Sequence, residues 1–264
     1  MAYARATFID DPDTLPRMPP WVTSARPETH EDVAFLSGAA LAHLHLVVGR
    51  DDVPQALLRE SLALRAAEAC VVHSGRPERA ADLRDALAFL QPGDSPGPAG
   101  ESYLSWRRAV ERPVAAKALN RALPTLEPEQ IATWLEVVKA APVTQAATVL
   151  EAVLGDRPRD FTSALILADA TLAQALGWSH VLPLLALGLK RGDLRKTGEE
   201  LRLICHQAIG TVAVETTHQA IDLTRRAARL KEAAPKLRAR GSDKAVAHLR
   251  PAGGVRGRPR AHRA

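Results

Sequence analysis

The chain has 264 residues, 46% of them hydrophobic and 25% charged, so it can bury a sizeable core and is not a disordered polypeptide. Its two cysteines exclude a disulfide framework and indicate a reducing compartment. The formal charge of +5 is uneven: residues 225–264 carry thirteen Lys and Arg against two Asp and Glu, a net charge of +11, and the rest therefore carries −6.

The first 28 residues contain five prolines, which favour an extended, irregular arm. Trp21 lies within this arm, and we expect it to contact the folded body. The first residues are acidic and lack a long apolar stretch, so no secretory signal is expected. The longest apolar run, residues 181–189, is too short to cross a bilayer. These features predict a cytoplasmic protein.

Helices are predicted from the first residues after this arm. Thr29, with Asp32 three residues later, has the pattern of a helix start, and Gly49 has that of a helix end. A glycine- and proline-rich segment, PGDSPGPAG, follows at 92–100. Its prolines lack the N–H donors that a phosphate-binding loop needs, so we interpret it as a rigid corner. Before this corner, the predicted helices cover residues 29–49, 54–74 and 77–92.

Five further helical segments are predicted between residues 100 and 177, separated by proline or glycine. Asp160 caps the most apolar of them, FTSALILADATLAQAL, which should be buried on nearly all sides. The predicted boundaries are 100–113, two short helices within 113–142, then 143–154 and 160–177, and a short apolar segment follows at 183–190.

The longest predicted helix covers residues 197–234. Its apolar and small side chains recur every three or four residues, which places them on one side of an α-helix. Thr197 and Glu200 indicate a capping box at its start, and Pro235 marks its end. The predicted stripe consists of Leu201, Cys205, Ala208, Val212, Thr216, Gln219, Leu223, Ala227, Leu230 and Ala234.

The predicted fold is all-α, an irregular bundle of helices around this long C-terminal helix. No stretch predicts a strand, and aromatic residues make up only 4% of the chain, so Leu, Val and Ala must form the core. We expect a proline-rich arm at 1–28, one helical domain at 29–249, which ends in a short helix at 242–249, and a disordered arginine-rich tail at 250–264.

Motifs for metals and cofactors were considered and rejected. Glu215 and His218 form an E-x-x-H pair, but di-iron bundles need a second copy that the sequence lacks. Cys70 and His73 could share a helix face, but no further pair supplies the other two ligands of a zinc site. The chain has no nucleophile elbow, P-loop or dinucleotide-binding motif. We therefore predict no metal and no cofactor.

Four segments carry a family resemblance: HEDVAFLSGAALAHL at 30–44, GRPERAADLRDALAFLQPGDSPGPAGESYLSWRR at 75–108, LADATLAQALGWSHVLPLL at 167–185 and APKLRARGS at 234–242. In this order they resemble an uncharacterised bacterial family, domain of unknown function 1403. The resemblance implies no activity, cofactor or catalytic residue. It does imply a shared pattern that includes Arg84, Asp85, Asp94, Gly97, Pro98, Gly100, Trp106, Arg107, Asp169 and Trp178.

Asp169 is the most informative single residue because it lies on a helix that is apolar nearly all round. A buried carboxylate there must find a cation or hydrogen-bond donors, or become neutral. Arg84 and Arg107, in another family-like segment, are the expected partners. We interpret the cluster of Arg84, Asp85, Arg107 and Asp169 mainly as a buried ion pair that fixes helix register. The alternatives are a catalytic or ligand-binding carboxylate and an aspartate that reaches solvent.

The tail contains Arg256-Gly257-Arg258-Pro259-Arg260, which is similar to the core of an AT-hook. An extended segment of this kind fits the narrow minor groove of A·T-rich DNA, where arginine is favoured. The alternative is a disordered tail whose composition produces this string by chance.

These observations predict a non-enzymatic cytoplasmic binding or adaptor protein with an unidentified protein partner. Its basic tail is expected to contact DNA or another acidic partner, and no membrane association is expected. Apolar helix faces left uncovered would favour a homo-oligomer. The rival hypothesis is an enzyme with its site among Arg84, Asp85, Arg107 and Asp169 in a helical pocket.

Overall fold

The computed structural model describes residues 17–91, 93–136 and 139–233, which form eleven α-helices, one 3-10 helix and no strand. This confirms the all-α prediction. The helices are α1 (Pro20–Thr23), α2 (His30–Val48), α3 (Gln55–His73), α4 (Ala80–Ala88), α5 (Gly97–Glu111), α6 (Ala116–Ala122), α7 (Pro128–Leu135), α8 (Pro142–Asp156), α9 (Phe161–Ala175), α10 (Leu184–Gly188), the 3-10 helix η2 (Asp193–Arg195) and α11 (Gly198–Ala233).

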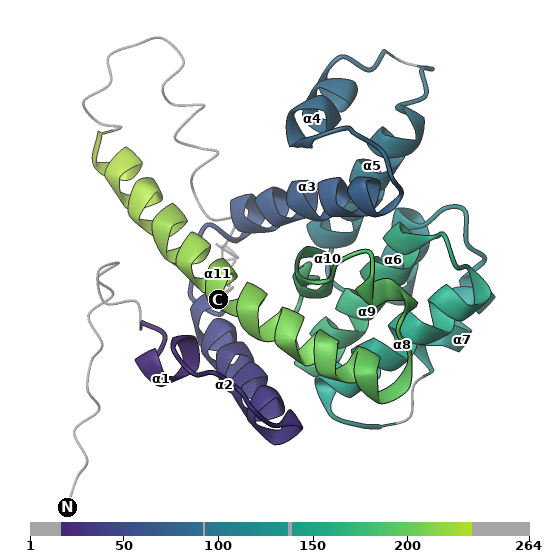
Figure 1. Ribbon diagram of the computed structural model, residues 1–264. Coiled ribbons are helices and arrows are strands. Elements are labelled where there is room, and N and C mark those ends of the chain that lie inside the picture. Colours follow the sequence, from purple (N-terminus) through teal and green to yellow (C-terminus); the bar gives the residue numbers. More distant parts are fainter. Residues whose placement is uncertain (1–16, 92, 137–138, 234–264) are drawn as a thin grey trace, which may run out of the picture.

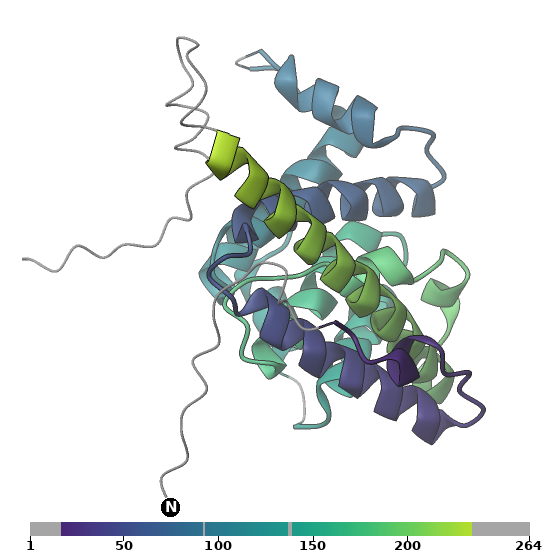
Figure 2. The same ribbon diagram turned by 90° about the vertical axis from the view of Figure 1, so that its left-hand side faces the viewer.

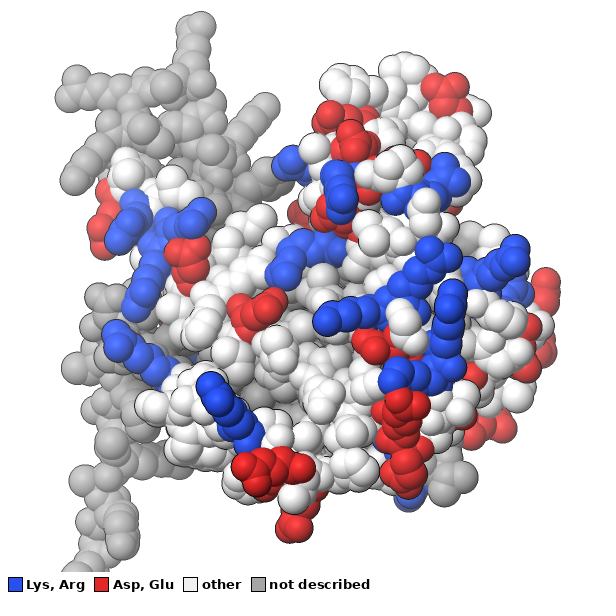
Figure 3. All heavy atoms as spheres, viewed as in Figure 1, with Lys and Arg blue, Asp and Glu red and all other residues white. Residues whose placement is uncertain are grey.

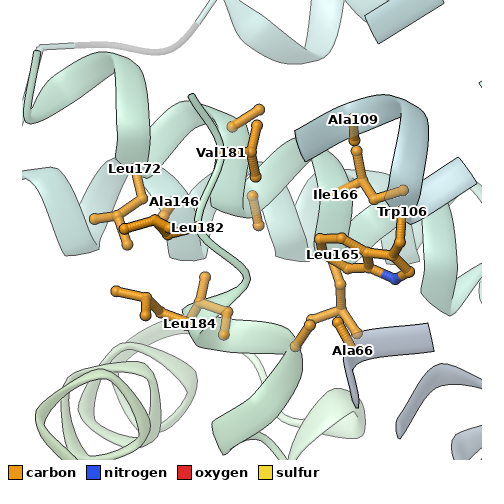
Figure 4. Packing of buried hydrophobic residues seen from close by; sticks show 14 of the residues in the cluster. Ala66, Trp106, Ala109, Ala146, Leu165, Ile166, Leu172, Val181, Leu182 and Leu184 are labelled. Atoms are coloured by element: carbon orange, nitrogen blue, oxygen red, sulfur yellow. The ribbon is translucent and has the colours of Figure 1, made fainter. Parts of the chain in front are cut away.

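Helix α9 lies at the centre of the core, with helices around it (Figure 1). Eleven of its fifteen residues are buried, as its apolar sequence predicts, and Asp160 caps its start by accepting the Ser163 N–H at 3.1 Å. Figure 4 shows how this helix packs: Leu165 and Ile166 face Trp106 of α5, while Leu172 lies near Ala146 of α8. The interior is therefore built mainly from leucine and alanine.

Helix α11 confirms the predicted long helix and packs along α2 and α10 (Figures 1 and 2). Its predicted stripe is buried at the start, where Leu201 is 1% exposed, and it stays largely buried as far as Ala227. Leu230 is 49% exposed, so the last turns extend beyond the core. The helix therefore packs on the bundle from its start to Ala227, and only its last turns do not.

Helix α2 begins with the predicted cap: Thr29 accepts the Asp32 N–H at 3.1 Å, and Asp32 accepts the Thr29 N–H at 2.9 Å. By length and composition α2 is also apolar enough to cross a membrane, although core helices share this property. Its Ala40 and Leu44 are fully buried in the bundle. The apolar sequence thus has a role inside the fold.

The N-terminal arm contains a short helix, α1, which the prolines did not predict. Trp21 stacks on Phe35 of α2 with ring centroids 5.6 Å apart, and both side chains remain more than half exposed. Trp21 therefore does contact the body, at its surface. The predicted helix at 242–249, the tail at 250–264 and its segment Arg256–Arg260 lie outside the described residues.

Candidate functional site

Asp169 is fully buried, and its partners are backbone amides rather than arginines. Its Oδ1 accepts the N–H groups of Leu184 and Leu185 at 3.1 and 2.8 Å, and its Oδ2 accepts that of Ala186 at 3.2 Å. Burial raises the pKa of this carboxyl to about 7, while the three hydrogen bonds lower it. The predicted pairing of Asp169 with Arg84 or Arg107 is therefore wrong.

The other members of the predicted cluster are exposed. Arg84 and Asp85 lie on α4, and Arg107 lies on α5, all at the surface. Arg107 borders a small recess of about 210 Å³ together with Arg59, Glu60 and Glu111. The four residues thus do not share one cleft. The N–H groups at the start of α10 supply the hydrogen bonds of Asp169, so this carboxyl needs no arginine partner.

A pocket of about 220 Å³ lies where the end of α2, the start of α3 and the segment after α9 meet. Arginine, histidine, serine, glutamine and tryptophan side chains line it together with valine and leucine, and no Asp or Glu of the described residues does. Its lining consists of His45, Val48, Gly49, Gln55, Arg59, Gly177, Trp178, Ser179, His180 and Leu182. We call it the basic pocket.

Arg59 gives the basic pocket its positive charge. Its Nε donates to the carbonyl of Val110 at 3.0 Å, one of the last carbonyls of α5, which have no partner within their own helix. Its other four guanidinium N–H groups have no protein partner among the described residues, and burial lowers the pKa of Arg59. A half-buried cation is therefore held in place with most of its donors unused.

The segment after α9 supplies the opposite wall. Gly177 has a φ of +68°, and its turn lets the Trp178 N–H donate to the carbonyl of Ala173 at 2.8 Å. The Trp178 indole then donates to Nδ1 of His45 at 2.8 Å, which leaves the proton of neutral His45 on Nε2. Burial and the charge of Arg59 lower the pKa of His180, so this imidazole is neutral at pH 7.

An apolar hollow of about 780 Å³ adjoins the basic pocket. Within it, the Ser37 Oγ lies 2.6 Å from Nδ1 of His206 and donates its only hydrogen to the Ala34 carbonyl at 2.9 Å. The hollow is lined by Ala34, Ser37, Gly38, Leu41, Ala42, His45, Leu46, Ala141, Pro142, Val143, Thr144, Leu176 and His206.

The sequence pointed to Trp178 through the family pattern but missed Arg59, His45 and His180. One usable signal was the GWSH segment at 177–180, in which tryptophan and histidine directly follow the glycine that ends a helix and precede a buried apolar run. Arg59 gave no signal, since it lies among many surface arginines. Of the rejected metal pairs, Glu215 lies 3.5 Å from an Arg65 nitrogen, a contact with a cation.

A family model described as "Protein of unknown function (DUF1403)" matches residues 6–261, nearly the whole chain. No curated protein and no solved structure matches the chain.

Proposed function

Because the chain belongs to the DUF1403 family, whose description assigns no activity, we propose from the geometry that it is a non-enzymatic binding protein for a small anionic ligand. The observation that carries this proposal is Arg59, which lines the basic pocket with four unused N–H donors. A carboxylate or phosphate group accepts two such donors at once. Burial strengthens this attraction because water competes less for the charges.

The histidines favour the same class of ligand. Nε2–H of His45 is available as a donor, since Nδ1 is occupied by Trp178. No carboxylate of the described part of the chain lines the basic pocket, so an anion there meets no direct repulsion from that lining. Gln55 is the first residue of the 19-residue helix α3, and the start of a helix also favours negative charge.

The test is titration of the full-length protein with inorganic phosphate or propanoate, followed by NMR at the Trp178 indole N–H. We expect a saturable shift that Arg59→Gln weakens tenfold or more, because hydrogen bonds to charged groups contribute about 1.5–3 kcal/mol. Arg65→Gln on the exposed side of α3 is the matched control and should bind as the unaltered protein does. No saturable shift, or equal weakening by both substitutions, would contradict the proposal.

A second proposal concerns the tail: we infer that residues 250–264 give the protein a salt-sensitive affinity for DNA or another acidic partner. Residues 250–264 carry five arginines and no Asp or Glu, which is +5 of the net charge of +11 over residues 225–264, and this charge supports the proposal. Over the face of the described body seen in Figure 3, by contrast, positive and negative side chains are mixed. Deleting residues 250–264 should abolish a salt-sensitive gel shift, and a shift that survives the deletion would contradict this proposal.

We also propose a cytoplasmic location. Separately, we propose that a protein partner or a second copy of the chain covers exposed apolar side chains, among them Phe35 at 63% and Phe89 at 75% exposed. Light scattering of the full chain would test self-association.

A further inference from the structure

Helix α2 is apolar on two sides, and only one of them faces the core. Only 33% of its most apolar 18-residue window is buried inside the bundle. Leu46 on its outer side is 63% exposed and lines the apolar hollow. Apolar side chains that border open space of this size indicate a surface that an apolar ligand covers.

The hollow and the basic pocket follow one another along α2. His45 lines both, and Leu176 of the hollow is followed directly by Gly177 and Trp178 of the basic pocket. From Ala34 to Gly49 the helix rises about 22 Å, at about 1.5 Å per residue. One elongated ligand could therefore lie along α2, with its charged end beside Arg59.

The two compartments match the two ends of an amphiphile: the hollow is apolar, and the basic pocket carries a positive charge. Among the described residues, no Lys, Arg, Asp or Glu lines the hollow of about 780 Å³, while the basic pocket of about 220 Å³ holds the half-buried guanidinium of Arg59. The smaller volume is below that of most ligand sites and suits a head group, and the larger one lies within the range for whole ligands.

We propose that the protein binds a linear long-chain carboxylic acid, with its carboxylate at Arg59 and its alkyl chain in the hollow. This inference rests on the proposed anion site and adds the class of ligand.

Gly38 offers a direct test because it lines the hollow in the middle of α2. A Cβ placed there meets nothing within 4 Å, so Gly38→Leu adds a side chain to open space without a clash and raises helix propensity. Gly155 in α8 has the same open surroundings and lies away from both compartments, so Gly155→Leu is the matched control.

The experiment measures calorimetric affinities of full-length protein for propanoate, octanoate, decanoate and dodecanoate below their micelle concentrations, with decanol as the uncharged probe. We expect affinity to rise by about fourfold per methylene until the hollow is full. Gly38→Leu should weaken dodecanoate at least tenfold and leave propanoate unchanged, and Gly155→Leu should change neither. Arg59→Gln should weaken decanoate tenfold or more and leave decanol unchanged.

Three results would overturn the inference. If propanoate binds but longer acids bind no better, the anion site stands and the chain site is wrong. If chain-length dependence is the same in Gly38→Leu, the alkyl chain lies elsewhere. If propanoate does not bind and decanol binds as tightly as decanoate, the anion site itself is refuted and this inference with it.

Discussion

Replacing Asp169 tests how the interior is held together. This carboxylate lies on the central helix α9 and accepts the N–H groups of Leu184, Leu185 and Ala186. These are the first three amides of α10, and no carbonyl within that helix can accept them. Asp169 therefore caps a buried helix that is distant in sequence by fifteen residues.

The loss of stability follows from the number of donors left without an acceptor. Each buried N–H without a partner costs about 1–3 kcal/mol. In Asp169→Ala the N–H groups of Leu185 and Ala186 lose their acceptor, while that of Leu184 keeps the Leu182 carbonyl at 2.8 Å. We therefore expect the free energy of unfolding to fall by about 2–6 kcal/mol, a large part of the total for a typical domain. Asp169→Asn keeps an oxygen for Leu184 and Leu185 and loses only the bond to Ala186, about 1–3 kcal/mol.

The same carboxyl predicts a pH dependence whose sign follows from its raised pKa. In the unfolded chain an aspartate has a pKa of about 3.9, and in the fold burial raises the pKa of Asp169 to about 7. Between these values the folded state binds the proton more tightly. The stability that the fold gains by binding this proton is therefore fully present below about pH 4 and is lost as the pH rises to about 7. Over this range the free energy of unfolding falls by up to about 1.4 kcal/mol per pH unit.

Urea unfolding followed by circular dichroism at several pH values from 4 to 8 measures both effects. The Asp169→Asn variant should lack this component of the pH dependence, whereas Asp222→Ala, at an exposed ion pair on α11, should retain it and change stability by less than about 0.5 kcal/mol. If Asp169→Ala is no less stable than Asp169→Asn, the cap does not hold α10 and the reasoning fails.

Three further outcomes are expected. Gly188→Ala should lower the free energy of unfolding in urea by about 1–3 kcal/mol, because the added Cβ would lie 2.7 Å from that of Ala208 where α10 crosses α11. An unchanged free energy would mean that α10 and α11 can move apart at this contact without cost. Leu201→Ala should lower the free energy of unfolding by about 2–5 kcal/mol and Leu230→Ala by less than about 1 kcal/mol, since only Leu201 is buried. Equal losses would contradict the conclusion that the last turns of α11 lie outside the core. The two buried thiols, whose pKa burial raises to about 12, should react with a thiol reagent at pH 8 only after unfolding, and rapid reaction of the native protein would contradict this.

Helix positions could be predicted from the sequence because their signals are local. The Thr29 and Asp32 cap, the Asp160 cap and the Gly49 helix end each depend on residues within four positions, and all are present. The long helix was likewise predicted within one residue at its start. Such features need no knowledge of the rest of the fold.

The partner of Asp169 and the basic pocket depend on tertiary structure. A buried carboxylate predicts that some donor is near, but backbone amides carry no sequence signature, whereas arginine side chains do. Arg59 was missed for a related reason: its role depends on Val110 and on a wall from residues 177–182 that the helix pattern does not place.

These two features of the structure are connected. The chain leaves α9 at Gly177, supplies Trp178 and His180 to the basic pocket, and reaches α10, whose start is fixed to α9 by Asp169. The wall is thus fixed to α9 at both ends. At one end it continues directly from α9 through Gly177, and at the other the Asp169 carboxyl of α9 binds the first amides of α10. A change at Asp169 that leaves the protein folded should therefore also weaken anion binding, although Asp169 does not line the pocket. Trp178 is the residue at which this coupling would be seen, because its indole hydrogen bond to His45 joins that wall to α2.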